Sequence, residues 1–270
     1  MCMQRYGPLA WASMSCCFRQ GSKLASLITL LAAGARVVAL ESNKDFLPSL
    51  QFLQNNMDGQ LEFSFKLDPL RHGTMQPPVL YSSVLFNSLC IPEASRTKDV
   101  PFKVIGLLPQ KNESTFLWKQ IYNLYDRNIS IYRYGRIELN MFLSEKQYMK
   151  LVSQPGDMRN YQALSALFHA SCDIELLHME IVPNDHLCLE RITPRRDLFT
   201  NSLTRGNGNI FIVMVKQCLG KRKAKPDPGN GHKLLRQLAL PEDILTGDVT
   251  YEQYKQLFEA MECSEEFNKS

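Results

Sequence analysis

Basic side chains gather in one stretch of the chain, where they could bind a negatively charged polymer. Between residues 191 and 236 only Asp197 and Asp227 oppose them. The basic residues of this stretch are Arg191, Arg195, Arg196, Arg205, Lys216, Lys221, Arg222, Lys223, Lys225, Lys233 and Arg236. Arginine and lysine neutralise phosphates without reading base sequence, so this asymmetry predicts a nucleic-acid partner. A solvated surface with a flexible basic loop is the alternative.

Six of these side chains are our candidate phosphate contacts, because they lie at or beyond the point where the pattern of the chain changes. They are Arg195, Arg196, Arg205, Lys221, Arg222 and Lys223. Binding through such contacts should weaken steeply with salt. The run from residue 221 to 225 also resembles a nuclear localisation patch, but a single basic run is a weak signal.

The eight cysteines do not indicate a metal or redox site. They form no C-x-x-C pair and have no partner histidines at zinc spacing, which is typical of reduced thiols in a reducing compartment. Apolar residues make up 44% and charged residues 21% of the 270 positions, as in globular proteins with a sizeable core. No apolar run is long enough to span a bilayer, so we expect no membrane partner.

Residues 1–20 differ from the rest of the chain. They are rich in apolar residues, include Arg5 and Arg19, and contain no acid; the first acidic residue is Glu41. This composition suits a mitochondrial presequence, which is basic and poor in acids. A splice product or a mis-started gene model explains it equally well, so we expect an atypical segment here.

The region from residue 21 to 200 alternates short apolar segments with amphipathic ones. We expect strands at residues 36–40, 102–108, 137–143 and 174–179, and helices at residues 23–33, 46–55, 115–125, 145–153 and 161–170. This alternation predicts an α/β domain with an open, mainly parallel sheet covered by helices on both faces. Right-handed crossovers make it Rossmann-like, with a ligand site at the carboxyl ends of the strands.

After residue 200 the pattern contains helices only. We expect them at residues 209–219, 233–240 and 251–261, separated by a basic segment rich in glycine and proline. Residues 201–270 are therefore predicted to form a small helical domain.

Several motifs, taken in order, resemble one protein family. The matching segments are residues 35–42, the run of Met141, Phe142, Leu143, Ser144, Glu145 and Lys146 with Leu151, Pro155, Gly156, Tyr161, Leu164, Ser165, Cys172 and Asp173, then residues 194–200 and 210–223. They are similar to the class I rRNA adenine dimethyltransferases, which use S-adenosylmethionine. Within that family the segments most resemble the branch of mitochondrial transcription factors B.

The resemblance implies a class I methyltransferase fold whose methyl-donor half is altered or truncated. The family needs a glycine-rich turn after its first strand, where this chain retains only Gly21 and no first strand is recognisable. It also needs an acid at the end of the second strand to accept hydrogen bonds from the donor's ribose, and Glu41 fits that place. Residues 59–68 look shortened relative to the family, and the acid on the adenine side is missing, because Asp68 lies too far along the chain to take its place.

The target-base turn of the family is also altered. An N-L-P-Y-like turn there accepts hydrogen bonds from adenine and stacks on it, whereas this chain has Leu107, Leu108, Pro109 and Gln110. Leucine cannot accept a hydrogen bond and glutamine is a poor stacking surface. Since these contacts orient the attacking nitrogen, we expect weak or no methyl transfer.

The resemblance thus implies a factor in the mitochondrial matrix, at the nucleoid, that helps mitochondrial RNA polymerase to melt promoter DNA beside the HMG-box activator. A former base-capture cleft with a basic rim could hold single-stranded DNA. The alternatives are a working dimethyltransferase acting on a hairpin of small-subunit mitochondrial rRNA, and an inactive truncated variant.

Overall fold

The computed structural model describes most of the chain after residue 90 and separate parts before it. The described residues are 9–13, 27–41, 44–57, 59–65, 86–87, 91–95, 97–108, 110–126, 131–182, 185–220, 241 and 244–263. Gly21, Pro109 and residues 221–223, named above as site candidates, lie outside them.

The chain forms two compact units that do not follow a single cut in the sequence. The first unit comprises Met1–Phe116, Asn128–Glu145 and Glu175–Thr193, and the second comprises Leu117–Arg127, Lys146–Ile174 and Pro194–Ser270. The second unit thus includes residues 117–127, 146–174 and 194–200 of the region that the sequence assigned to the α/β domain.

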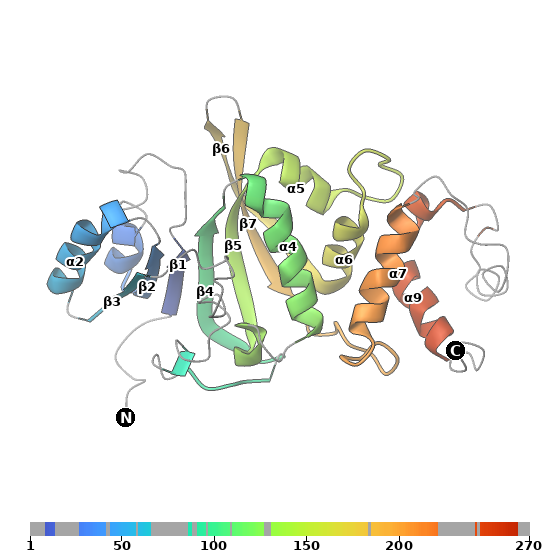
Figure 1. Ribbon diagram of the computed structural model, residues 1–270, viewed down its shortest axis with the longest axis horizontal. Helices are drawn as coiled ribbons and strands as arrows, with labels where there is room; N and C mark the ends of the chain where they lie inside the picture. The colour runs from blue at the N-terminus through green and yellow to red at the C-terminus, as the bar shows by residue number, and fades with distance from the viewer. Residues whose placement is uncertain are drawn as a thin grey trace. The chain divides into compact units, whose positions relative to one another are not determined.

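A seven-stranded sheet organises the α/β part (Figure 1). Its strands are β1 Leu9–Ser13, β2 Arg36–Glu41, β3 Leu61–Phe65, β4 Asp99–Leu107, β5 Arg136–Ser144, β6 Cys172–Val182 and β7 Asp185–Pro194, in the order β3-β2-β1-β4-β5-β7-β6. Pairing is parallel from β3 to β5, and β7 runs antiparallel to β5. This is the strand order of the class I methyltransferase fold, so the predicted fold class is confirmed.

The expectation that the first strand is missing was wrong. Leu9–Ser13 forms β1, and its register places Trp11 beside Val38 of β2 and Val104 of β4. Its small residues give a weak strand signal in the sequence. Parallel ladders on both sides supply the backbone hydrogen bonds that a five-residue strand needs. The strand β7 was also absent from the sequence prediction.

The helices mostly match the predicted positions. They are α2 Leu47–Asn56, α4 Gln110–Tyr125, α5 Glu145–Val152, α6 Ala163–Ser171, α7 Gly208–Gly220 and α9 Tyr251–Glu262, with short 3-10 turns at Lys44–Phe46, Ile131–Tyr134 and Thr246–Asp248. Residues 27–32 are also helical. The predicted helix at residues 233–240 lies outside the described parts of the chain.

The first unit has an apolar core around β2 and β3. Helical residues 27–32 and α2 pack there, with the buried side chains of Leu27, Leu31, Ala35, Val37, Ala39, Phe46, Leu50, Leu53 and Leu61. Gly34 follows the first of these helices at φ +80°, the left-handed conformation that ends a helix and favours glycine. Val38 is as buried as its neighbours in β2, so both faces of this strand are covered, as expected in a parallel sheet.

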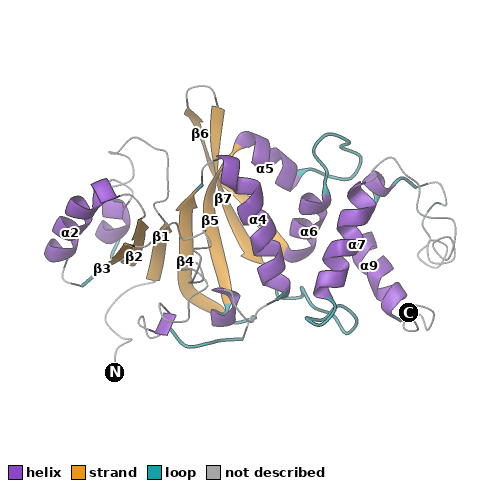
Figure 2. Cartoon of the chain, in the orientation of Figure 1, coloured by secondary structure: helices purple, strands orange, loops and turns teal. Residues whose placement is uncertain are grey.

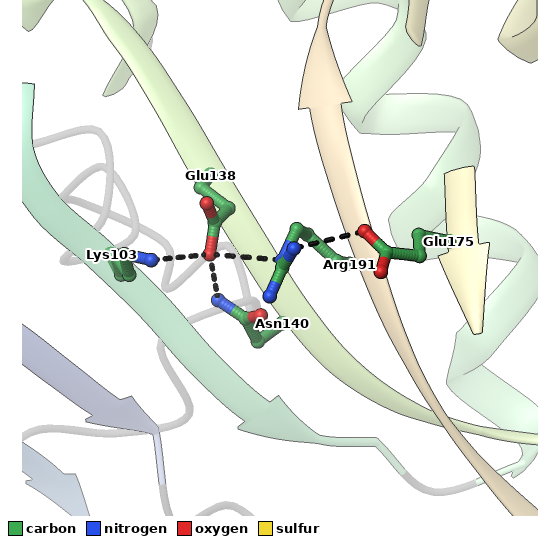
Figure 3. A network of polar contacts seen from close by, with 5 residues as sticks. All are labelled: Lys103, Glu138, Asn140, Glu175 and Arg191. Carbon is green, nitrogen blue, oxygen red and sulfur yellow. Dashed lines mark hydrogen bonds and ion pairs between the residues drawn. The ribbon is translucent and has the colours of Figure 1, made fainter. Parts of the chain in front are cut away.

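A polar network crosses four strands of the same unit (Figure 3). Lys103 on β4 and Asn140 on β5 both reach Oε1 of Glu138, at 2.9 and 3.0 Å. Arg191 on β7 lies 3.6 Å from the same oxygen and 2.9 Å from the carboxylate of Glu175 on β6. The network balances two cations against two carboxylates, so the charge of Arg191 is already neutralised within the sheet.

The second unit is built from packed helices (Figure 2). The ring of Phe211 on α7 lies 5.9 Å from Tyr125 and 5.4 Å from Phe258 on α9, centroid to centroid. At Gly208 a Cβ atom would lie 2.7 Å from the Tyr125 ring, so only glycine allows this close approach. Among the described residues, no helix is long and apolar enough to cross a membrane.

Candidate nucleic-acid interface

The carboxyl ends of three parallel strands meet at one edge of the sheet. β1 ends at Ser13, which lies beside Leu40 of β2 and Gly106 of β4. Glu41 is the last residue of β2 and Leu107 the last of β4. This edge is where open α/β sheets bind ligands, so the backbone brings Glu41 and the altered base turn to the edge expected from the sequence.

The described part of the altered turn offers little for holding a base. Leu107 is half-buried beside Phe142 of β5, and Leu108 is buried. Gln110 is exposed and begins α4. Neither leucine supplies a side-chain hydrogen-bond acceptor, so the polar contacts that would orient an adenine amino group have no source at these two positions.

Arg195 is occupied by contacts inside the second unit. Its guanidinium lies 3.2 Å from Asp173, donates to the Tyr251 hydroxyl at 3.2 Å, and stands 5.2 Å above the Tyr251 ring. Burial lowers the pKa of Arg195, but the hydrogen bond to Tyr251 and the charge of Asp173 more than offset this, so its pKa is raised. The side chain joins the end of β7 to the start of α9.

His169 of α6 stacks on the same tyrosine ring at 5.9 Å. Burial lowers the pKa of His169, which favours the neutral imidazole beside the ring. The tyrosine thereby connects α6, the end of β7 and α9.

The other candidate phosphate contacts differ from Arg195 in their surroundings. Arg196 and Arg205 are exposed on the second unit, whereas residues 221–223 lie beyond the described end of α7. The structure therefore does not gather the candidates into one described cluster. Within the described ranges, no group of three or more histidine, cysteine, aspartate or glutamate residues could hold a metal ion.

An aromatic and cationic surface, which the sequence analysis missed, lies on α4 and α7 of the second unit. The ammonium nitrogen of Lys216 is 4.9 Å from the Trp118 ring centroid and 5.9 Å from that of Tyr122. It also donates to the Tyr122 hydroxyl at 3.3 Å. We call Trp118, Tyr122 and Lys216 the aromatic platform.

The platform is accessible and continues along α7. Lys216 is exposed and the two aromatic rings are half-buried. Ile210 and Val213, about two turns and one turn before Lys216, are 58% and 45% exposed. The i, i+4 spacing of Trp118 and Tyr122 was the available sequence signal, but Lys216 could be assigned to them only once the two helices were placed side by side.

This arrangement combines the two elements that bind single-stranded nucleic acid. Aromatic rings stack on unpaired bases, and cations follow the phosphate backbone. The basic residues 221–223 come directly after α7 in the sequence.

Comparison with known proteins finds relatives along most of the chain. The chain is 38% identical over 269 residues to dimethyladenosine transferase 2, mitochondrial, of Bos taurus, covering 88% of this chain and 68% of that protein. The protein of that name from Mus musculus is 40% identical over 274 residues, with the same two coverages of 88% and 68%. The names of these relatives state that they are mitochondrial, and we assign the chain to mitochondria.

Solved structures are much more distant. A methyltransferase from Pyrococcus furiosus is 9% identical at a TM-score of 0.37, covering 70% of this chain and 76% of that chain. No protein-family model matches the chain.

The contacts of Arg195 predict that its replacement affects protein stability rather than nucleic-acid binding. Arg195→Ala should lower the free energy of unfolding by roughly 1–2 kcal/mol, because it removes a charged hydrogen bond and a cation–π contact. It should leave the salt dependence of nucleic-acid binding unchanged. Urea unfolding and binding titrations at several salt concentrations measure the two effects.

Arg205→Ala is the matched comparison, because Arg205 is exposed. It should change stability by less than about 0.5 kcal/mol and reduce the salt slope by roughly 0.7. The assignment of Arg195 fails if Arg195→Ala is as stable as the wild type and instead reduces the salt slope.

Proposed function

Because the chain belongs to the mitochondrial dimethyladenosine transferase family, we propose that it acts in mitochondrial transcription initiation. It binds unpaired promoter DNA and assists mitochondrial RNA polymerase in melting the promoter, at the nucleoid in the matrix. Its other partner is the HMG-box transcription activator. The methyltransferase scaffold then serves as a nucleic-acid binding protein.

The aromatic platform carries this proposal. Trp118 and Tyr122 offer two ring surfaces, and Lys216 places a positive charge within 6 Å of both. Melted DNA exposes unpaired bases together with phosphates, which is the combination that such a surface binds without sequence preference. The described part of the base turn supports the same conclusion, since Leu107 and Leu108 favour a binding role over catalysis.

A second candidate function is S-adenosylmethionine-dependent dimethylation of an rRNA adenine. The name of the relatives favours this function, as does the position of Glu41 at the carboxyl end of β2. Glu41 would hold the ribose hydroxyls of the donor, and the donor would supply the methyl group. The loop that carries Gly21 lies outside the described residues. Leu107 opposes this function, because the family turn has a polar acceptor there.

The platform predicts weaker binding of single-stranded DNA when its rings are removed. Trp118→Leu and Tyr122→Leu should each weaken affinity by about 10- to 100-fold, because stacking contributes roughly 1–3 kcal/mol per base. Lys216→Gln should lower the salt slope by about 0.7. Fluorescence anisotropy with a labelled oligonucleotide measures both effects.

Two exposed residues of the first unit serve as controls for these variants. Phe52 on α2 is 69% exposed, and Lys44, in the 3-10 turn that precedes α2, is also exposed. Phe52→Leu and Lys44→Gln should bind like the wild type. If they weaken binding as much as the platform variants do, the platform is not the binding surface.

Run-off transcription tests the proposed role directly. Purified mitochondrial RNA polymerase and the HMG-box activator, with this chain added, should produce transcript from a closed duplex promoter. Tyr122→Leu should reduce that transcript while leaving transcription from a premelted promoter intact, because melting is the step that it impairs. No transcript from either promoter, or a chain without a cooperative thermal transition, would indicate an inactive variant.

Methyl transfer separates the two candidate functions. An rRNA hairpin incubated with the chain and S-adenosylmethionine should acquire little or no dimethyladenosine, because Leu107 cannot orient the adenine amino group. Mass spectrometry of the digested RNA, with a working dimethyltransferase as positive control, gives the answer. Stoichiometric dimethyladenosine would favour the second function.

A further inference from the structure

A glutamate without a partner lies in the core of the first unit. Glu190 of β7 has no exposed surface. It faces Met141 of β5, and the same face carries the buried side chains of Leu139, Leu143, Cys188 and Ile192. Among the described residues, neither carboxyl oxygen of Glu190 has a hydrogen-bond partner.

A second buried glutamate ties α4 to the sheet. Glu113, in the first turn of α4, is 3% exposed. Its two oxygens accept from the Ser144 backbone N–H at 2.8 Å and from the Ser144 hydroxyl at 2.7 Å. Ser144 is the last residue of β5, so this carboxylate holds the beginning of α4 against the carboxyl end of β5.

Glu138 of β5 and Glu190 of β7 have opposite electrostatic environments. Glu138 is on the other face of the sheet, where Asn140, Lys103 and Arg191 outweigh its burial and lower its pKa (Figure 3). Burial raises the pKa of Glu190 to about 8, and the negative charge of Glu113 adds to the effect. Arg191, the next residue of β7, points to the other face and contacts Glu138 and Glu175.

We propose that Glu190 holds a proton in the folded chain and acts as a proton-linked switch on the contact between α4 and the end of β5. When the proton leaves, a second negative charge is buried near Glu113, and neither oxygen of Glu190 has a hydrogen-bond partner among the described residues to stabilise it. Repulsion between the two carboxylates then weakens the hydrogen bonds that Glu113 accepts from Ser144. This inference does not depend on the proposed function.

The direction in which pH changes the stability of the fold follows from proton uptake on folding. An unfolded glutamate releases its proton near its ordinary pKa of 4.5, whereas folded Glu190 releases it near 8. Between these values folding takes up a proton, so the chain loses stability as pH rises through this window and the loss levels off above it. The unfolding equilibrium constant should rise by up to about tenfold per pH unit.

A proton suits this site better than a metal ion. A divalent cation needs several oxygen ligands, while both Glu113 oxygens already accept hydrogen bonds from Ser144. The described β5 and β7 side chains around Glu190 supply no oxygen. A single proton neutralises Glu190 without further ligands.

Urea unfolding of the full chain between pH 5.5 and 9 tests the proposal. In Glu190→Gln the unfolding equilibrium constant should no longer rise with pH through this window. The variant should be more stable than the wild type at pH 8. Glu180→Gln, at an exposed position of β6, is the matched control and should keep the wild-type dependence. Hydrogen exchange should show that the Ser144 amide loses protection above pH 8 in the wild type and keeps it in Glu190→Gln.

Two further measurements keep the proposal testable if the variant does not fold. Infrared spectra of the wild type should contain the band of a protonated carboxylic acid, lost with a midpoint near pH 8. Absence of that band at pH 6.5, or an unchanged pH dependence in Glu190→Gln, overturns the proposal. Stabilisation at pH 8 by Mg²⁺ or Ca²⁺ that depends on Glu190 would show a metal site instead.

Discussion

The parallel pairing of β1 with both β2 and β4 is the constraint on which the α/β part depends. β1 has five residues, and it is the only element that joins the β2–β3 side of the described sheet to β4 and β5. Without its two ladders, β2 and β4 would each have an unpaired edge, and their carboxyl ends would not meet. The edge that carries Glu41 and Leu107 is therefore a consequence of this short strand.

The two faces of the central strands show how neighbouring residues of one strand acquire opposite roles. Arg191 points to the face where Lys103, Glu138 and Asn140 form a charge-balanced network, while Glu190 points to an apolar face with no hydrogen-bond partner among the described residues. Alternation along β7 separates the two environments by one residue. Burial without a partner favours the neutral acid, and burial with cations favours the carboxylate.

In the second unit, contacts decide which cations are available to a ligand. Arg195 belongs to the basic stretch by composition, yet Asp173 and Tyr251 hold it within the unit. Lys216 was an unremarked member of the same stretch, yet it lies over two aromatic rings at the surface. Counting charges along a sequence identifies a basic region but does not distinguish paired cations from accessible ones.

The sequence by itself determined the α/β class, the approximate positions of most helices and of four strands, the altered base turn and the family resemblance. These follow from local apolar periodicity and from ordered motifs, which are properties of short segments. Only the tertiary structure decided that Leu9–Ser13 is a central strand, that Arg195 is a structural contact, and that Trp118, Tyr122 and Lys216 share a surface. Each of these depends on a partner distant in sequence, and a residue carries no local signal of the partner that pairs with it, neutralises it or stacks on it.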